Sequence, residues 1–403
     1  MSFNIAVICT QYYPLSHADV IVTRWLEAHA NDIHVGWKPV TKIATLYVAQ
    51  HPEGDPPPGD WFSVSPNGRV ERYDPKFDIS RLVAQHYGVP LFPTIRDALT
   101  MGGADLAVDA VLLIGEHGDY AQNEFDQKMY PRKELFDAIV DVFRDLGRVL
   151  PVFCDKHLTW NMAWAVEMVA TIRAMQIPFF AGSSAPMPVS GPLYELNLPR
   201  NAELVESLGL FYLHPEAYGI HSIEYLQSII ERRGGGESGI RALTAYVGDG
   251  VWEAMAQGVW SQDLFDFTLA AALTAKPGDY RQNCQAHGRY QPVAFVMEHE
   301  DGHRSTQIMV EGHIQDFIAG VRLRGDGLLR AAPANLVGLN DFVRHFARLD
   351  REIQKFFLTG QSPVALERHL LTTLQVATWM HALKQPGQRI ATPQLQIAYQ
   401  PVQ

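Results

Sequence analysis

The sequence predicts an α/β protein that begins with a doubly wound parallel sheet and continues into an α+β domain with an open, largely antiparallel sheet. Three observations lead to this prediction. Short runs rich in Val, Ile and Leu alternate with segments of helical periodicity in the first half of the chain. The second half has alternating strands around an Asp-Gly turn, followed by two long amphipathic helices. At 403 residues, the chain is long enough for two domains with separate cores.

The predicted strands of the first half are continuous apolar runs, as expected for strands buried on both faces. They span 5–9, 43–48, 108–114 and 149–153, and the helical segments span 19–30, 80–87, 95–99 and 131–146. Gly88 follows one helix in the place of a C-cap. Residues 51–78 are rich in Pro, Gly and Asp and predict a surface insertion. Strands joined by helical crossovers imply a parallel sheet.

The second half begins with a helix and a strand and then changes character. The expected elements are helices over 160–175, 218–232, 339–358 and 363–383, and strands over 178–182, 292–298 and 306–311, with residues 210–213 leading into the helix at 218. His299 and His303 flank the Asp-Gly turn, where we expect them to be solvated. We place the first domain at 1–156 and an α+β domain for substrate binding and oligomerisation at 157–403, with its last helices available to pack back on the first domain.

Composition narrows the class of protein. The chain has 33 basic and 44 acidic residues, a formal charge of −11, and no basic run. This balance argues against nucleic acid or an anionic membrane as a partner. The 3 cysteines are too scattered for a disulfide framework, and Cys9 and Cys154 are expected to be small buried residues. No signal peptide and no apolar stretch of roughly 18 residues is present, which predicts a cytoplasmic protein.

The segment Cys154-Asp155-Lys156-His157-Leu158 is the strongest candidate for chemistry. A lysine at the mouth of a parallel strand, between an acid and an imidazole, can bind or protonate an oxygen. His221, at the start of a later helix, supplies a second group for proton transfer. The structural alternatives are a surface lysine for Lys156 and a packing or capping role for His221 and His157.

Two further groups follow strands of the predicted sheet. Glu116 and His117 come after the strand at 108–114, at the end of a parallel sheet where ligands bind. Ser16, His17 and Asp19 follow the first strand, where a phosphate or metal could bind, although capping of the next helix explains them equally well. The segment 130–134 (Tyr-Pro-Arg-Lys-Glu) predicts a helix start, and its basic residues could contact an anionic substrate.

Several segments together resemble the glucose–fructose oxidoreductase, inositol dehydrogenase and MocA family. Residues 82–90 and 108–111 are similar to the family's helix with its glycine and to the strand that ends under the cofactor. Cys154 to Leu158 resembles the Glu-Lys-Pro signature, Gly219-Ile220-His221 resembles the Gly-x-His of the catalytic helix, and 363–393 resembles the closing helices. The resemblance covers most of the chain except roughly 51–78 and 118–132.

This resemblance implies a Rossmann-like first domain that binds NAD or NADP, and an oxidoreductase that transfers hydride to or from a sugar, cyclitol or related hydroxy compound. The implied catalytic residues are Lys156, His221 and Asp155, the cofactor-binding residues are Thr10, Gln11, Gly115, Glu116 and His117, and the substrate-binding residues are His157, Glu216 and Tyr218. A polyhydroxylated small-molecule substrate is expected. So is a homodimer or homotetramer that associates through an exposed sheet face.

The chain departs from this family at chemically important positions. The loop from Thr10 to Asp19 contains no glycine, although a pyrophosphate requires close approach of the backbone. The second strand ends at Gln50-His51 and not at an acid for the ribose hydroxyls. His157 replaces the proline of the signature, and Ala217 replaces an aspartate.

The departures keep an alternative function open. A lyase, isomerase or hydrolase on the same scaffold would use Lys156 and His221 for proton transfer without a dinucleotide. A divalent metal is a variant of this hypothesis, if six side chains converge: His17, Glu116, His117, Asp155, His157 and His221. A third hypothesis is a non-catalytic sensor with a degenerate cleft.

Overall fold

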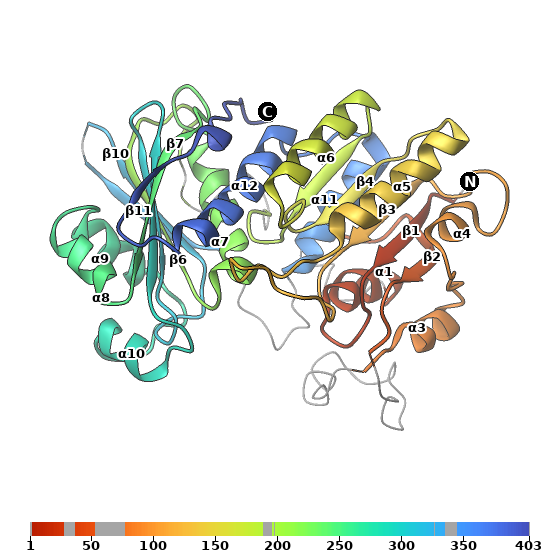
Figure 1. Ribbon diagram of the computed structural model, residues 1–403, viewed down its shortest axis with the longest axis horizontal. Helices are drawn as coiled ribbons and strands as arrows, with labels where there is room; N and C mark the ends of the chain where they lie inside the picture. The colour runs from red at the N-terminus through yellow and green to blue at the C-terminus, as the bar shows by residue number, and fades with distance from the viewer. Residues whose placement is uncertain are drawn as a thin grey trace. The chain divides into compact units, whose positions relative to one another are not determined.

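The computed structural model describes residues 2–27, 37–52, 77–187, 196, 198–325, 327–334 and 345–402. The chain forms two compact units (Figure 1). The first comprises Met1–Ala121, Met129–Val189 and Gly338–Pro363, and the second comprises Gln122–Lys128, Ser190–Val337 and Val364–Gln403. The domain boundary placed after residue 156 stays a prediction.

The first unit contains a five-stranded sheet in which every strand is parallel to its neighbours. Its strands are β1 (Asn4–Cys9), β2 (Lys42–Val48), β3 (Ala110–Ile114), β4 (Val152–Asp155) and β5 (Phe179–Gly182), in the order β2-β1-β3-β4-β5. The predicted parallel sheet is confirmed. Nearly all of its side chains are buried, which explains why the strands are continuous apolar runs.

A single residue extends this sheet beyond β2. Leu46 forms a parallel bridge with Leu91, its N–H donating to the carbonyl of Pro90 (3.0 Å) and its carbonyl accepting from Phe92 N–H (2.8 Å). With this bridge counted, the order matches that of a dinucleotide-binding fold whose third strand is reduced to one residue. The strand order reverses between β1 and β3, which is the place where such sheets bind ligands.

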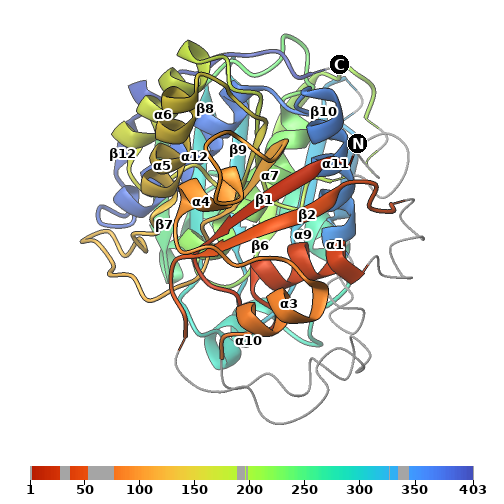
Figure 2. The same ribbon diagram turned by 90° about the vertical axis from the view of Figure 1, so that its right-hand side faces the viewer.

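Helices cover both faces of this sheet. One face carries α4 (Ile95–Thr100), α5 (Arg132–Leu146) and α6 (Met162–Ala174), while the other carries the segment η1–α1 (Asp19–Thr23, Arg24–Glu27) and α11 (Phe346–Thr359) (Figures 1 and 2). The helix α3 (Ser80–Tyr87) ends at Gly88 in the left-handed conformation (φ 64°), as predicted. The segment η1 is π-helical, a form that recurs at functional sites.

The second unit contains a mixed seven-stranded sheet in the order β11-β10-β6-β9-β8-β7-β12. Its strands are β6 (Leu204–Phe211), β7 (Ile240–Val247), β8 (Val293–His299), β9 (Arg304–Met309), β10 (Ile318–Leu323), β11 (Leu329–Pro333) and β12 (Arg389–Ala391). Among the described strand pairs of this sheet, β6 with β9 is parallel and the others are antiparallel, so the predicted largely antiparallel sheet is confirmed.

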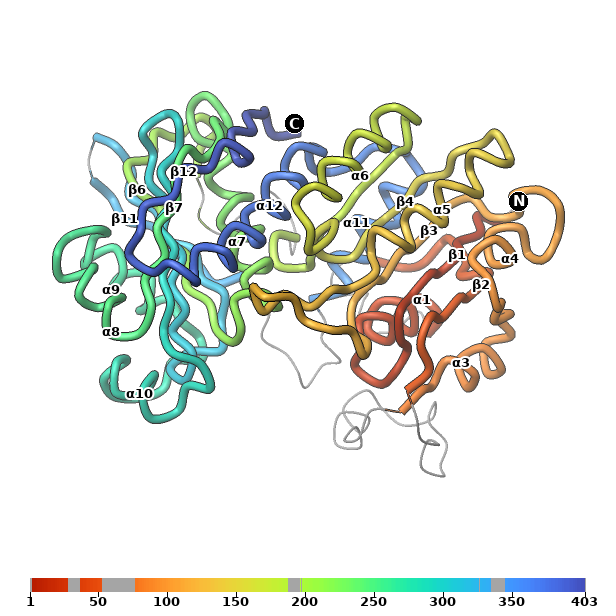
Figure 3. The backbone as a smooth tube through the Cα atoms, in the orientation of Figure 1, coloured from red at the N-terminus to blue at the C-terminus, as the bar shows by residue number. Residues whose placement is uncertain are grey.

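Both faces of the seven-stranded sheet are covered. The helices α7 (Pro215–Ile230) and α12 (Leu366–Ala382) pack on one face, and α8 (Asp249–Ala256) and α9 (Gln262–Ala270), with α10 (Tyr280–His287) nearby, lie on the other (Figure 3). Leu208, Val296 and Ile308 point into a core that includes Trp252 and Phe265 of these helices. The expectation of an exposed sheet face was therefore wrong, because the segment between β7 and β8 folds over it.

The two histidines beside the Asp-Gly turn are also buried, which corrects the prediction that they are solvated. His299 is 0% and His303 5% exposed. His299 pairs through Nδ1 with the buried carboxylate of Glu237 (3.0 Å), and His303 Nε2 lies 2.9 Å from Ser207 Oγ. The turn itself forms as predicted, but both imidazoles turn inward and find polar partners.

Some predicted segments lie outside the described residues. These are 28–30 of the first predicted helix, 53–76 of the insertion and 339–344 of the helix that precedes residue 345. Among the described helices, none combines the length and apolar character needed to cross a membrane.

Candidate functional site

The loops that follow β1, β3 and β4 form the candidate site at the carboxyl end of the five-stranded sheet. Close to the end of its strand, each contains a residue other than glycine in the left-handed region: Leu15 (φ 61°), His117 (φ 70°) and Lys156 (φ 70°). This conformation costs a side-chain-bearing residue roughly 1–2 kcal/mol, and such strain concentrates at functional sites.

His17 and Asp155 form a hydrogen-bonded pair between the first and third of these loops. Asp155 is fully buried, and its Oδ2 lies 2.7 Å from His17 Nδ1. The carboxylate accepts, so Nδ1 of His17 donates its N–H to Asp155, and Nε2 is the ring nitrogen outside this bond. Nε2 has no hydrogen-bond partner among the described residues, and the side chain is 13% exposed. Rings of His117 and Phe346 contact the imidazole edge-on.

Glu116 forms a buried ion pair with Arg132, the first residue of α5. Burial by itself would raise the pKa of the Glu116 carboxyl. The positive charges of Arg132 and, to a smaller extent, Lys156 lower the pKa by more than burial raises it, so it falls well below its usual range. The backbone carbonyl of Glu116 accepts a hydrogen bond from Thr10 Oγ1. This contact ties the ends of β1 and β3 together.

His157 lies on the other side of Arg132. Its Nε2 is 3.2 Å from Arg132 Nη1, and the residue is 5% exposed. Burial and the neighbouring guanidinium hold the pKa of His157 well below 6.5, so the ring is neutral. Its Nδ1 is buried without a hydrogen-bond partner in the described part of the chain. Oδ1 of Asp155 is likewise buried and has no hydrogen-bond partner among the described residues.

Lys156 follows β4 directly and is 4% exposed. Its backbone N–H donates to the carbonyl of Gly182 (3.1 Å), which fixes the turn at the end of the strand. The strand extends to Asp155, two residues beyond the predicted end at 153, so Asp155 has strand geometry. The lysine is close enough to Glu116 to lower the pKa of its carboxyl.

The remaining predicted residues have definite positions whose proposed roles stay predictions. Gln11 Nε2 donates to Gln50 Oε1 (3.2 Å), and the missing side chain of Gly115 makes room for Arg132. Glu216, Tyr218 and His221 lie in the second unit, within the first two turns of α7. Glu216 and His221 are buried, and His221 contacts the rings of Tyr218 and Phe317. The partnership of Lys156 with His221 also stays a prediction.

The loop after β1 lies where a dinucleotide-binding fold holds the pyrophosphate, which binds to backbone amides near a helix start. Here those amides have partners within the loop: Tyr13 N–H donates to Ser16 Oγ (3.2 Å), Leu15 N–H to Asp19 Oδ2 (2.9 Å) and Asp19 N–H to Ser16 Oγ (3.2 Å). Tyr12 and Tyr13 are buried, as is the carboxylate of Asp19. A carboxylate at the helix start repels an anion, and these residues do not fit a pyrophosphate.

The end of β2 likewise lacks a ribose-binding acid. Gln50 occupies this position, where its Oε1 accepts from Asp119 N–H (2.9 Å) and its Nε2 donates to the Asp119 carbonyl (3.2 Å). Its side chain therefore holds the loops after β2 and β3 together. His51 pairs with Asp78 (2.6 Å).

The metal variant of the sequence hypothesis gains no support. Among the described residues, no group of three or more His, Cys, Asp or Glu side chains is placed to hold a metal ion. His17 and Asp155 bond to each other, and Glu116 and His157 both contact Arg132.

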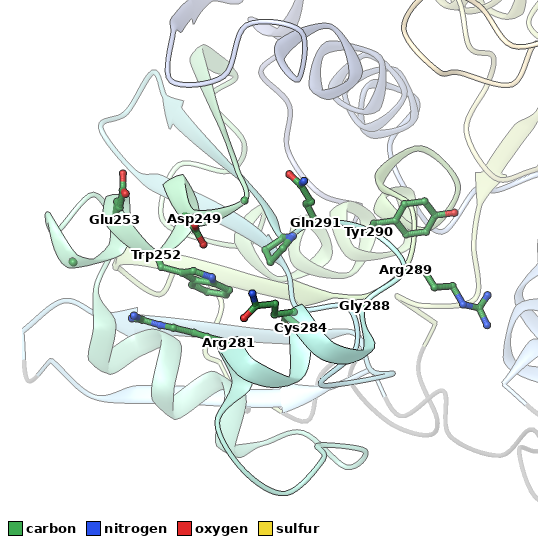
Figure 4. Close-up of a pocket in the computed structure, with 13 residues that line it drawn as sticks. Asp249, Trp252, Glu253, Arg281, Cys284, Gly288, Arg289, Tyr290 and Gln291 are labelled. Atoms are coloured by element: carbon green, nitrogen blue, oxygen red, sulfur yellow. The ribbon is translucent and has the colours of Figure 1, made fainter.

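A separate pocket of about 730 Å³ lies in the second unit beside α8 and α10 (Figure 4). The guanidinium of Arg281 lies 5.7 Å from the centroid of the Trp252 ring, and Cys284 and Tyr290 also line the pocket. None of the residues predicted for the site lines it. Burial raises the pKa of the Cys284 thiol to about 12, so the thiol is protonated at neutral pH.

Sequence reasoning missed Arg132 as a member of the site. Its place at a predicted helix start was recognised, but not its contacts with Glu116 and His157. Nothing in the spacing signals them, because 16 and 25 residues separate Arg132 from these partners. The pairing of His17 with Asp155 spans 138 residues and was equally hidden.

No protein-family model matches the chain. No curated protein matches it either. Solved structures do: a probable dehydrogenase from Thermotoga maritima (TM-score 0.54, 10% identity, 98% of this chain and 100% of that one). A second is myo-inositol 2-dehydrogenase from Lactobacillus plantarum (TM-score 0.54, 10% identity, 97% of this chain and 99% of that one). A third is GenD2 from gentamicin A biosynthesis in complex with NAD (TM-score 0.53, 11% identity, 97% of this chain and 96% of that one). At such identities the likeness shows the fold alone. The chain therefore has the two-domain α/β fold seen in the glucose–fructose oxidoreductase, inositol dehydrogenase and MocA dehydrogenases.

Proposed function

We propose that this protein is an isomerase or lyase that moves a proton on a small polyhydroxylated carbonyl compound without a nicotinamide cofactor. The observation that carries the proposal is the His17–Asp155 pair at the carboxyl end of the five-stranded sheet. A carboxylate that holds the Nδ1–H of an imidazole orients the ring and leaves Nε2 as a general base. His17 meets this description, because its Nε2 is unoccupied and its side chain is partly exposed.

The proposed reaction begins when His17 Nε2 removes a proton from the carbon next to the substrate carbonyl. The electron pair of the broken C–H bond forms a C=C bond, and the carbonyl π pair moves onto the oxygen. Lys156 stabilises this developing oxyanion through its ammonium group. In an isomerase, His17 returns the proton to the other carbon of the enediol while a hydroxyl proton passes between the oxygens. In a lyase, the β-hydroxyl takes the proton from His17 Nε2 and leaves as water with the electron pair of its C–O bond. The oxyanion then re-forms the carbonyl, and the C=C bond moves to between the α and β carbons.

The substrate class rests on the fold and on the donors of the site. Solved structures of this fold include inositol dehydrogenases, whose substrates are polyhydroxylated. Lys156 and His157 offer positive charge and a hydrogen-bond donor to substrate oxygens. His221 remains the second predicted proton-transfer residue of this reaction.

The decisive experiment follows exchange of carbon-bound hydrogen with solvent. The protein is incubated in D₂O with fructose, dihydroxyacetone or a keto-inositol, and loss of C–H signals is followed by NMR. We expect catalysed exchange with at least one compound, reduced roughly 10²–10⁴-fold by His17→Gln. His287→Gln, at an exposed histidine of α10, is the matched control and keeps the wild-type rate. No exchange with any compound, or equal exchange by His17→Gln, refutes the proposal.

A nicotinamide-dependent dehydrogenase is the second candidate, favoured by the shared fold and by the NAD bound in the structure of GenD2. The loop after β1 argues against a dehydrogenase, because amides of this loop already donate to Asp19 and Ser16 and because the Asp19 carboxylate lies at the helix start. A thermal-shift titration with NAD(H) and NADP(H) separates the two functions. Ligand at a hundred times its Kd would stabilise the protein by roughly 2.7 kcal/mol. We expect no such stabilisation.

A further inference from the structure

The environment of His157 restricts which of its two nitrogens carries the proton. Arg132 Nη1 lies 3.2 Å from Nε2 of the imidazole, and both side chains are buried. An arginine guanidinium can only donate hydrogen bonds and stays protonated in proteins. Nε2 must therefore accept from Arg132, and an accepting Nε2 carries no proton.

The remaining nitrogen of a neutral imidazole then holds the hydrogen. For His157 this is Nδ1, which is buried and has no hydrogen-bond partner among the described residues. A buried donor without a partner is costly, with a penalty that a bound ligand removes. The neighbouring positive charges of Arg132 and Lys156 oppose protonation of the ring, while Glu116 favours it but is itself paired with Arg132.

We propose that Arg132 is a positioning residue that holds His157 as the neutral Nδ1–H tautomer, so that His157 donates a hydrogen bond to a carbonyl or hydroxyl oxygen of the ligand. The inference rests on the proposed function for the identity of the ligand, but the tautomer is a property of the protein alone. His157 complements Lys156 in this arrangement. The lysine supplies charge to the oxyanion, and the imidazole supplies a directed, uncharged donor.

The position of Arg132 is fixed independently of His157. Its guanidinium also contacts the Glu116 carboxylate, and the Tyr130 ring centroid lies 5.1 Å from its Cζ. Gly115 leaves no side chain in the volume that Arg132 fills. The guanidinium is therefore held at Nε2 whether or not a ligand is present.

Nitrogen-15 NMR of protein labelled at histidine tests the tautomer directly in the ligand-free state. The His157 signals are identified by their loss in His157→Gln. At neutral pH we expect a protonated Nδ1 and an unprotonated Nε2, the reverse of the tautomer favoured by free histidine. Arg132→Met removes the donor and shifts the equilibrium toward the Nε2–H form, and Arg132→Lys, which keeps a cationic donor, retains Nδ1–H. An Nε2–H ring or a doubly protonated ring in the wild type overturns the inference, whether or not the Arg132 variants fold.

Exchange kinetics test the donor role. The amide nitrogen of asparagine can replace Nδ1, whereas that of glutamine lies nearer to Nε2. We expect His157→Gln to lower the exchange rate with the keto compound by on the order of 10²-fold, and His157→Asn to retain more of it. Equal loss in both variants contradicts a donor at Nδ1. If the tautomer is as stated but no compound exchanges, the proposed function fails and the tautomer assignment stands. If His17-dependent exchange occurs but His157 carries its proton on Nε2, the tautomer assignment fails and the proposed function stands.

Discussion

Gly115 and Arg132 occupy adjoining space so closely that a Cβ atom on Gly115 would lie 2.5 Å from Arg132 Cγ. The same Cβ would lie 3.4 Å from the Cα and Cβ atoms of Arg132. Gly115 joins β3 to Glu116, the ion-pair partner of Arg132. The glycine therefore matters here for its small size, because it lets a buried guanidinium reach the end of the strand.

Replacement of Gly115 by alanine is expected to destabilise the protein by about 1–3 kcal/mol, because the added methyl group displaces Arg132. Urea denaturation measures the loss. Gly250→Ala is the control, since nothing lies within 4 Å of the added Cβ and alanine favours the helix α8. Equal stability of the two variants would show that Arg132 moves aside freely.

Asp155→Asn tests the His17 pair without changing its shape. Asparagine can offer its N–H to His17 Nδ1, which stabilises the wrong tautomer of the base. The exchange rate is expected to fall about 10²–10⁴-fold with the fold intact by circular dichroism. Asp145→Asn, at an exposed carboxylate, should leave the rate unchanged. An Asp155→Asn variant with wild-type exchange would remove the pair from the mechanism.

Acid should destabilise the protein in the range where free histidines titrate. Burial, with Arg132 acting on His157 and His299 on His303, holds the pKa of both imidazoles well below 6.5. The unfolded chain therefore binds these protons first, so their full stability is present above pH 6.5 and is lost as pH falls toward the folded pKa values. Each histidine contributes a slope of roughly 1.4 kcal/mol per pH unit.

Urea denaturation between pH 7.5 and 5.5 checks this slope. His303→Gln should flatten it, and His86→Gln, at an exposed histidine, should leave the slope as it is in the wild type. A free energy of unfolding that does not change over this range would contradict the buried neutral state of both rings.

Replacement of Glu237 is expected to destabilise the protein more than replacement of an acid at the surface of the second unit. It is buried against Arg233 (3.1 Å) and His299 (3.0 Å), which outweigh the effect of burial and hold the pKa of its carboxyl well below its usual range. Glu237→Gln leaves Arg233 incompletely compensated and should cost about 3–5 kcal/mol. Glu298→Gln, which weakens solvent-accessible pairs with Arg389 and Arg241, should cost at most about 1 kcal/mol. Thermal unfolding compares the two, and similar losses would refute the distinction.

A double-mutant cycle tests the predicted partnership of Lys156 and His221. If both act on one substrate, the losses of exchange rate in Lys156→Ala and His221→Ala are not additive in the double variant. Additive losses would assign the two residues to separate roles.

The sequence predicted best where local pattern and tertiary environment agree. The runs at 5–9 and 108–114 gave β1 and β3, because strands buried on both faces contain few polar residues. The covering of the second sheet escaped prediction. The strand β7 and the helices α8 to α10 have mixed composition, and only their packing on the sheet reveals which residues are buried.

The candidate site likewise has features that the sequence could predict and features that it could not. The motif around Lys156 and the acid and histidine after β3 could be located from sequence, because the carboxyl ends of parallel strands meet at one edge. The absence of glycine after β1 could be read from the sequence, whereas the hydrogen bonds from loop amides to Ser16 and Asp19 could not.

The sequence by itself determined where the strands of the first sheet lie along the chain and which residues follow them, since these depend on local hydrophobic pattern. Only the tertiary structure decided that His17 bonds to Asp155 and that Arg132 lies between Glu116 and His157. Such contacts depend on distances between segments far apart in the chain. The protonation state and tautomer of each imidazole follow from those distances, and no spacing in the sequence encodes them.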